Sequence, residues 1–493
     1  MSSPLAKLFG QTAMYGLPSI VGRLLNYLLV PLYTAIFAKP ADYGVLSDLY
    51  AYVAFLVVLL PLGMETAYFR FIQQQEDTER VFNSSFVPVV LVNAVFFLLL
   101  YLTNPWIAKW MLYRDHTEYI ILVGSIVCID AIASLPLAKL RAENQAKRFM
   151  IIQMSSILLN ILLNLIFLLG YFNPSRPEEG IMFILIANLL ASGLKLILVY
   201  NIIAKVKFIF DWDLIKKMLT YSWPLVIAGF AGIINETLDR VLLKQILYNP
   251  DIPNSLEQAT AQVGIYSACY KLAMLVTIFL QAYRYAAEPF FFSQLKNQDR
   301  NAVFVRTMNV FIAIVCLAFL FVSINLGVFK FFIRKEAYYV GLNVVPILLL
   351  ANVCLGIYYN QSVWYKLSNQ TKFGAYIALI GAGITILINV LFIPMYGYMA
   401  SAWATLLAYM AQMIISFYLG KKYYPIPYDV RKFYLYVGSA IGIYCLFSLL
   451  RMGMNVPLKG FNGLLIFLGN LMVLGFIYLV FRNERALLRI NKR

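Results

Sequence analysis

The sequence predicts an all-α polytopic membrane protein of about 14 transmembrane helices. The helices are expected to form two six-helix bundles related by an internal repeat, followed by two extra C-terminal helices. Three observations support this fold class. The 493 residues are 62% hydrophobic and only 13% charged, which is more apolar sequence than a soluble fold buries. The apolar residues gather in long runs, and short sequence patterns recur at a nearly constant offset.

Two segments of the chain, 43–71 and 263–291, share a Gly-x-x-Ser-x-x-Tyr pattern that opens a long apolar run. The matched positions are Gly44 with Gly264, Ser47 with Ser267, and Tyr50 with Tyr270. Further matches in the same order are Asn144-Gln145-x-Lys147 with Asn369-Gln370-x-Lys372, Asn164 with Asn389, and Ala187 with Ala404. The offsets of these matches lie between 217 and 225, and aligning Pro18 with Pro224 gives 206 near the start of the chain, as expected when loops change length after a duplication.

A membrane-spanning helix needs roughly 20 predominantly apolar residues, and each candidate run is bounded by polar or basic residues. The expected spans, in chain order, are 11–37, 45–64, 84–103, 119–137, 149–172, 180–200, 221–241, 263–281, 308–328, 338–360, 371–394, 397–418, 432–450 and 461–481. The first six form one bundle within 1–204, the next six form its copy within 205–428, and the last two lie in 429–493 with a basic tail. Because six is even, both copies enter the membrane in the same direction, which predicts a substrate path at their interface.

The net charge of +17 comes from basic residues in short loops rather than from a soluble basic face, which argues against nucleic-acid binding. With the N-terminus inside, 26 of the 40 Lys and Arg residues fall in inner segments, 11 in outer loops and 3 within helices. The positive-inside rule therefore predicts that both termini are cytoplasmic. The linker 201–220 carries four lysines, which suit the anionic inner leaflet.

No expected loop exceeds about 20 residues, which leaves no room for a soluble catalytic domain. The sequence contains no nucleophile–base pair, phosphate-binding glycine loop or metal cluster, so we predict a protein that is not an enzyme and uses no metal or cofactor. The Asp211-x-Asp213 pattern resembles a metal motif, but Asp213 stands where the N-cap of the next helix is expected.

The best placed charge within an expected span is Arg23, near the middle of the first helix. A charge near the bilayer centre costs at least about 2.5–3.5 kcal/mol, so its presence requires a reason. Ser19 lies four residues before Arg23 and Asn26 three residues after it, which puts all three on one helix face. This polar stripe favours residues that line a substrate cavity, and a structural ion pair between helices is the alternative.

Lys271 and Arg284, in the eighth helix and its extension, are the second pair of candidates for the substrate cavity. The internal repeat is informative here, because the copy of Lys271 is Ala51 and the copy of Arg23 is Gly229. The helical scaffold is duplicated but these charges are not, which favours a role in function. For Arg284 the alternative is that it marks the cytoplasmic end of its helix.

Four acidic residues in or near the spans are candidates for ion or proton coupling: Asp130, Glu65, Glu236 and Asp239. For Asp130 and Glu65 the alternative is hydrogen-bonded packing between helices. For Glu236 and Asp239 the alternative is a local salt bridge, because Glu236 and Arg240 are four residues apart on one helix.

Four stretches carry a resemblance to a known family: PLYTAIFAKPADYGVLSDLYAY, LGMETAYFRF, SWPLVIAGF with TLDRVLL, and VGIYSACYKLA. They resemble the polysaccharide-transporter, or O-antigen flippase, branch of the multidrug/oligosaccharidyl-lipid/polysaccharide exporter superfamily. The resemblance covers the first twelve expected helices. It implies two six-helix bundles around a central, often cationic cavity in a bacterial cytoplasmic membrane.

The resemblance also implies a function and its partners. Members of the branch move undecaprenyl-pyrophosphate-linked oligosaccharides, the repeat units of O-antigen, capsule or exopolysaccharide, between leaflets by alternating access. The expected partners are this lipid-linked substrate, membrane lipids, and the polymerase and glycosyltransferases of the pathway. Related lipid II flippases use cavity arginines on the first and eighth helices, where this chain has Arg23 and Lys271. Lysine binds a pyrophosphate less well than the forked guanidinium of arginine.

Two other functions fit a chain of this kind. A cation-coupled multidrug antiporter on the same fold would favour acidic over basic cavity residues, which Arg23 and Lys271 oppose. A membrane-embedded glycan polymerase or ligase would need a large outer loop with catalytic residues, which the short expected loops oppose.

Overall fold

The computed structural model describes residues 21–74, 77–207, 210–293, 298–368, 370–460 and 462–489. Over these ranges the ordered backbone is helical and contains no strand. Thirteen of the described helices are long and apolar enough to cross a membrane, and a shorter apolar helix, Val21–Ile36, precedes them. The prediction of an all-α polytopic membrane protein is therefore confirmed. The shorter helix is the described part of the span expected at 11–37.

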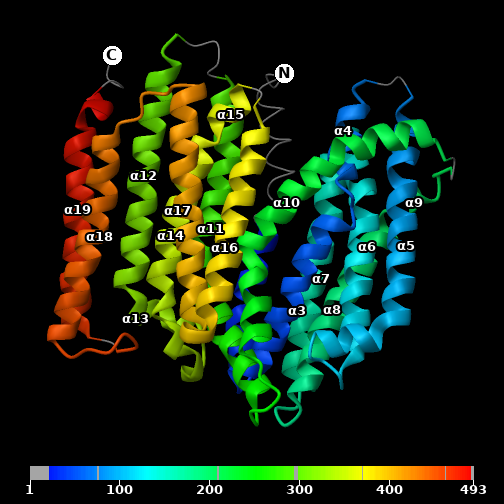
Figure 1. Ribbon diagram of the computed structural model, residues 1–493, viewed down its shortest axis with the longest axis horizontal. Helices are drawn as coiled ribbons and strands as arrows, with labels where there is room; N and C mark the ends of the chain where they lie inside the picture. Colours follow the sequence, from blue (N-terminus) through cyan, green and yellow to red (C-terminus); the bar gives the residue numbers. More distant parts are fainter. Residues whose placement is uncertain are drawn as a thin grey trace. The chain divides into compact units, whose positions relative to one another are not determined.

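The packing divides the chain into two compact units, Met1–Val263 and Gly264–Arg493. The helices of the first unit (Figure 1) are α2 (Val30–Ile36), α3 (Pro40–Leu59), α4 (Met64–Phe71), α5 (Thr78–Trp110), α6 (Thr117–Ala142), α7 (Ala146–Ile166), η1 (Phe167–Tyr171), α8 (Pro177–Leu198), α9 (Tyr200–Ile203) and α10 (Trp212–Leu247). The boundary between the units falls inside α11 (Ser255–Ser293), which is one continuous helix.

In the first unit the predicted second span consists of two helices, α3 and α4, separated by a short turn. Pro40 opens α3 at a position where its missing N–H is not needed. The turn ends at Gly63, whose φ of 64° is left-handed and favours glycine. A Cβ atom at Gly63 would lie 3.2 Å from the carbonyl oxygen of Ser222, so the close approach of α10 also requires glycine here.

One end of the first unit is held by an apolar core in which α4, α5, α6 and the start of α10 meet. Its buried residues are Met64, Ala67, Tyr68, Val81, Phe82, Phe86, Val89, Leu135, Ala138, Leu214 and Met218. The side chain of Asp211 caps α10 by accepting a hydrogen bond from the backbone N–H of Leu214 at 3.2 Å. The prediction that Asp213 is this N-cap is wrong, because the helix begins at Trp212 and Asp213 lies in its first turn.

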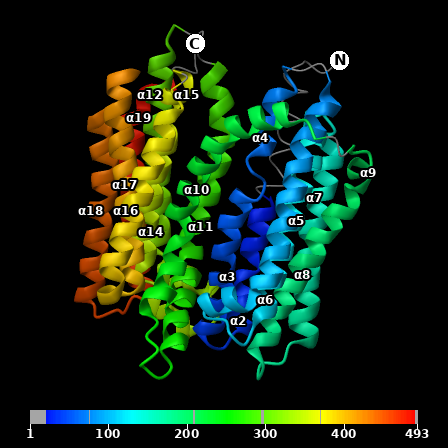
Figure 2. The same ribbon diagram turned by 45° about the vertical axis from the view of Figure 1, so that its right-hand side comes forward.

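The described helices of the second unit that follow α11 are α12 (Arg300–Ile324), α13 (Leu326–Phe329), η3 (Lys330–Phe332), η4 (Glu336–Gly341), α14 (Val344–Gln361), α15 (Val363–Leu367), α16 (Lys372–Tyr396), α17 (Tyr398–Tyr423), α18 (Val430–Gly453) and α19 (Gly463–Arg489). In Figure 2, α16 and α17 run side by side, joined through Gly397 with a φ of 53°. In the most apolar stretch of the span that contains α14, 83% of the residues are buried.

The last two helices pack against α12 of the second unit. The side-chain amides of Asn325 and Asn470 exchange hydrogen bonds of 3.1 and 3.0 Å between α12 and α19. Between α18 and α19, Glu484 accepts a hydrogen bond from the Tyr436 hydroxyl at 2.7 Å and pairs with Lys432 at 2.6 Å.

Packing and internal repeat divide the chain differently around α10. The repeat makes α10 the first helix of the second copy, whereas its contacts with α3, α4 and α5 place it in the first unit. The boundaries 1–204, 205–428 and 429–493 follow the duplication, which packing does not measure, and they stay a prediction.

Candidate functional site

The side chain of Arg23 is exposed on the apolar helix Val21–Ile36. Asn26, three residues further, is exposed as well, so the two polar groups open on the same side of the helix. Within the described residues Arg23 has no ion-pair partner, which does not support the alternative of a structural ion pair. Ser19 lies outside the described residues. Further along the same helix, the hydroxyl of Tyr33 donates to the side-chain oxygen of Asn164 on α7 at 2.9 Å and joins the two helices.

In the second unit Lys271 and Arg284 lie on α11, where a polar and aromatic strip connects it to α14. Lys271 is half-buried, and its Nζ lies 4.0 Å from the sulfur of Met274. The exposed guanidinium of Arg284 lies 5.3 Å from the ring centroid of Tyr359. The adjacent contacts are hydrogen bonds from the side-chain amide of Asn352 to the carbonyl of Ala273 at 3.0 Å and from Asn360 to the hydroxyl of Tyr283 at 2.6 Å. Cation, hydroxyl and ring faces of this kind bind phosphate and sugar groups.

Two of the acidic candidates face a cation on a neighbouring helix. Asp130 on α6 lies 2.6 Å from the Nζ of Lys195 on α8. Glu65 on α4 accepts a hydrogen bond of 2.6 Å from Arg141 on α6. Both pairs tie helices of the first unit together, as the packing alternative expects. Their role in ion or proton coupling stays a prediction.

The acidic candidates of α10 meet Arg240 in a different arrangement from the one expected. The guanidinium of Arg240 lies 3.2 Å from the carboxylate of the adjacent Asp239. The guanidinium also donates a 2.7 Å hydrogen bond to the backbone carbonyl of Glu236. Asp239 and Arg240 are both buried, so this end of α10 carries charges inside the unit.

A fully buried ion pair that the sequence reasoning missed joins Asp48 of α3 to Lys244 of α10. Neither side chain has any exposed surface. The Tyr113 hydroxyl donates to Asp48 at 2.7 Å, and the Lys244 ammonium donates to the carbonyl of Met111 at 2.8 Å. The ammonium also lies 3.9 Å from the ring centroid of Tyr113. This network fastens α3 and α10 to the α5–α6 connection.

A signal for this pair was present in the repeat. The copy of Asp48 is Ala268, so Asp48 is another charge that the duplication does not reproduce. Lys244 lies beyond the expected span 221–241, whereas α10 continues to Leu247 and includes it.

The sequence comparisons identify the family of the chain. The family model described as "Polysaccharide biosynthesis protein" matches residues 10–295, more than half of the sequence. The chain belongs to this family. A relative, Lsg locus putative protein 1 of Haemophilus influenzae, is 21% identical over 297 residues, covering 59% of this chain and 68% of that protein.

The fold has counterparts among solved structures. A lipid II flippase MurJ, described in an inward closed conformation, aligns with a TM-score of 0.73 and 14% identity over 95% of this chain and 99% of that one. A multidrug resistance MATE family transporter of the MOP superfamily in an inward-facing conformation aligns with a TM-score of 0.59 and 14% identity, covering 83% and 94%. The family expected from the sequence motifs is thus confirmed, and the solved structures share its fold.

Proposed function

We propose that the protein is a flippase that moves an undecaprenyl-pyrophosphate-linked oligosaccharide across a bacterial cytoplasmic membrane by alternating access. The cargo would be a repeat unit of O-antigen, capsule or exopolysaccharide. The family and the fold support the transport of a saccharide precursor. The observation that carries the proposal is Arg23, an exposed cation on an apolar helix without a carboxylate partner in the described part of the chain.

The chemistry of the cargo explains why such cations are needed. A pyrophosphate cannot enter hydrocarbon without its water, so fixed cations must take the place of that water. We assign this role to Arg23 with Ser19 and Asn26, and to Lys271 with Arg284. The glycan needs hydroxyl and aromatic groups, while the isoprenoid tail can remain in the lipid. Glycosyltransferases that build the cargo and a polymerase that consumes it are the partners this function implies.

The multidrug antiporter is less well supported by the same residues. A cationic drug needs a carboxylate that is free to bind it. Asp130 and Glu65 already face Lys195 and Arg141, so neither offers an unpaired anion.

Leaflet transfer of a lipid-linked oligosaccharide in proteoliposomes tests the proposal. We expect Arg23→Ala to lower transport about tenfold to a hundredfold, because a hydrogen bond to a charged group contributes about 1.5–3 kcal/mol. Arg23→Lys should lose less, and Lys271→Arg should be tolerated because the charge remains and the fork suits phosphate. Melting curves of each variant should stay near wild type.

Arg114→Ala is a matched control, because it removes an exposed arginine that lies between α5 and α6. It should leave transport unchanged. Full transport by a stable Arg23→Ala/Lys271→Ala double variant would refute the assignment of these residues to the pyrophosphate.

A further inference from the structure

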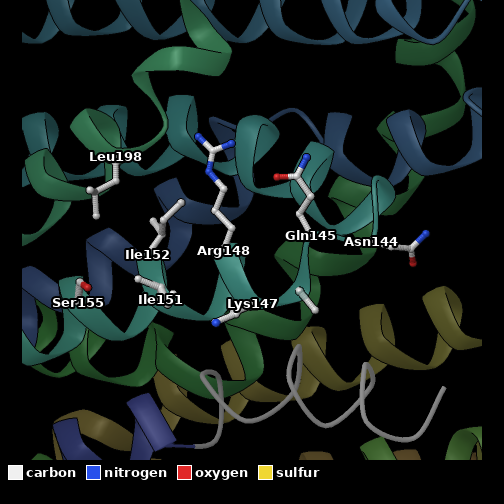
Figure 3. A pocket seen from close by; sticks show the side chains of 9 residues that line it. Asn144, Gln145, Lys147, Arg148, Ile151, Ile152, Ser155 and Leu198 are labelled. Carbon is white, nitrogen blue, oxygen red and sulfur yellow. The ribbon is translucent and has the colours of Figure 1, made fainter. Parts of the chain in front are cut away.

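A cavity of about 660 Å3 opens where α7 begins in the first unit, beside the end of α8 (Figure 3). Its lining is polar on one part and apolar on another. The polar residues are Asn144, Gln145, Lys147, Arg148 and Ser155, and the apolar ones include Ile151, Ile152 and Leu198. Figure 3 shows Gln145 and Arg148 extending in the same direction from the first turn of α7. A hydrogen bond of 2.7 Å from Ser156 on α7 to the carbonyl of Ala191 on α8 holds the two walls together.

The two cations of this cavity differ from three basic residues at the same end of the unit. Those three have carboxylate partners: Lys139 with Glu79, Arg141 with Glu65, and Arg80 with Asp211. Within the described residues Lys147 and Arg148 have no such partner, and the cavity lining contains no acid. The nearby Glu143 accepts a hydrogen bond from Gln145 at 2.7 Å and lies 3.9 Å from Lys139. Two positive charges therefore remain open to an anion.

The internal repeat provides a comparison for this site within the same chain. The turn Asn144-Gln145-x-Lys147 recurs in the second copy, but Arg148 is replaced there by Phe373. The Phe373 ring packs 4.8 Å from that of Tyr423 and 5.5 Å from that of Trp364, measured between centroids. The turn is thus a shared scaffold. In the first copy the sequence pattern is followed by an arginine that lines a cavity, whereas in the second copy it is followed by packed aromatic rings.

We propose that this cavity binds the phosphate headgroup of an anionic phospholipid of the inner leaflet. Arg148 and Lys147 would bind the phosphate oxygens, and the 21-residue helix α7, whose first turn carries no side-chain cap, begins in the cavity lining at Ala146. The apolar part of the lining suits the beginning of an acyl chain, which a soluble phosphate lacks. The charge bias puts this end of the unit on the cytoplasmic side. Basic pockets between helices on that side of a membrane bind anionic lipid headgroups. The proposal does not depend on which substrate is transported.

Lipid binding by the delipidated full-length protein tests this site without any transport. Phosphatidylglycerol is titrated into the protein in detergent, and the apparent Kd is read from the thermal shift, with phosphatidylcholine and inorganic phosphate as separate probes. We expect Lys147→Gln/Arg148→Gln to weaken phosphatidylglycerol binding at least tenfold. Arg148→Phe, which copies the second half of the chain, should weaken it too, and Arg148→Lys should retain most of the affinity.

The matched control is Lys109→Gln/Arg114→Gln, which removes two exposed charges from the end of α5 and the turn that follows it. It should leave the affinity unchanged. Equal binding by the Lys147/Arg148 double variant would overturn the proposal, and so would an equal loss in the control, because binding would then depend on net charge alone. If inorganic phosphate raised the Tm as much as phosphatidylglycerol does, the assignment of the site to a lipid would be overturned.

Discussion

Breaking the buried pair of Asp48 and Lys244 should destabilise the first unit strongly. Lys244→Met keeps the length and apolar stem of the side chain but leaves the Asp48 carboxylate without its counter-ion. Removing one partner of a buried ion pair costs about 3–5 kcal/mol, because the remaining charge has no exposed surface from which to reach water. Asp48→Asn should cost a similar amount, since the ammonium keeps only the carbonyl of Met111 and the ring of Tyr113.

The double variant Asp48→Asn/Lys244→Met should be more stable than either single variant. It leaves no uncompensated charge, and replacement of a whole buried pair by neutral groups is often close to neutral. The free energies of the two single changes should therefore be strongly non-additive, as expected for residues in direct contact.

Thermal unfolding of the purified protein measures this cycle. For a cooperative unit of roughly 250 residues, 3–5 kcal/mol corresponds to a fall of about 6–20 °C in Tm. The exposed pair of Lys39 and Glu257 in the same unit, at 2.8 Å, is the matched control, and breaking it should leave the Tm nearly unchanged because water screens the two charges. The reasoning would be refuted if Lys244→Met left the Tm unchanged. It would also be refuted if the double variant lost as much stability as the two single variants together.

Three further predictions concern orientation, pH and backbone conformation. A cysteine placed at Asn173 should react with an impermeant reagent added outside, and one at Lys147 should not; the reverse pattern would contradict the inferred topology. The hydrogen bond from Arg80 lowers the pKa of Asp211, so its stabilising effect is fully present at neutral pH and is lost as the pH falls below about 4. The Tm difference between wild type and Asp211→Asn should shrink over that range, and a constant difference would count against the pair. Gly63→Ala should cost about 1–2 kcal/mol in the free energy of unfolding, because the residue has a left-handed φ, and an unchanged Tm would contradict this.

The all-α membrane fold could be predicted from the sequence, because hydropathy reports directly on burial in the membrane. Each expected run from 45–64 onward corresponds to a described membrane span. The ends differ, and the first of these spans is interrupted by the turn before Gly63. The ends were missed where the helix continues in polar sequence: α10 extends from Trp212 to Leu247, well beyond the apolar core at 221–241. Hydropathy cannot detect such extensions, because they are stabilised by caps and by packing against other helices.

The candidate site could be predicted only in part from the sequence, for a different physical reason. A charge within an apolar run identifies a residue that needs a partner or a ligand, but it does not say which of the two. Arg23 and Asp130 looked alike in this respect, yet Asp130 lies 2.6 Å from Lys195, which comes from a distant helix. The pair of Asp48 and Lys244, 196 positions apart, depends on the same kind of tertiary contact.

The position of α10 limits how this protein could be cut into pieces. A chain split near residue 205, the predicted boundary of the repeat, would separate α10 from the helices that hold its two ends. Arg80 binds the start of α10 at Asp211, and Asp48 binds its other end at Lys244. A split after Leu247, before α11 begins at Ser255, keeps both attachments and leaves α11 uncut. Co-expressed fragments divided there should reassemble more readily than fragments divided at the ancestral junction. The predicted repeat and the bonds that hold the folded chain thus set different boundaries for fragment design.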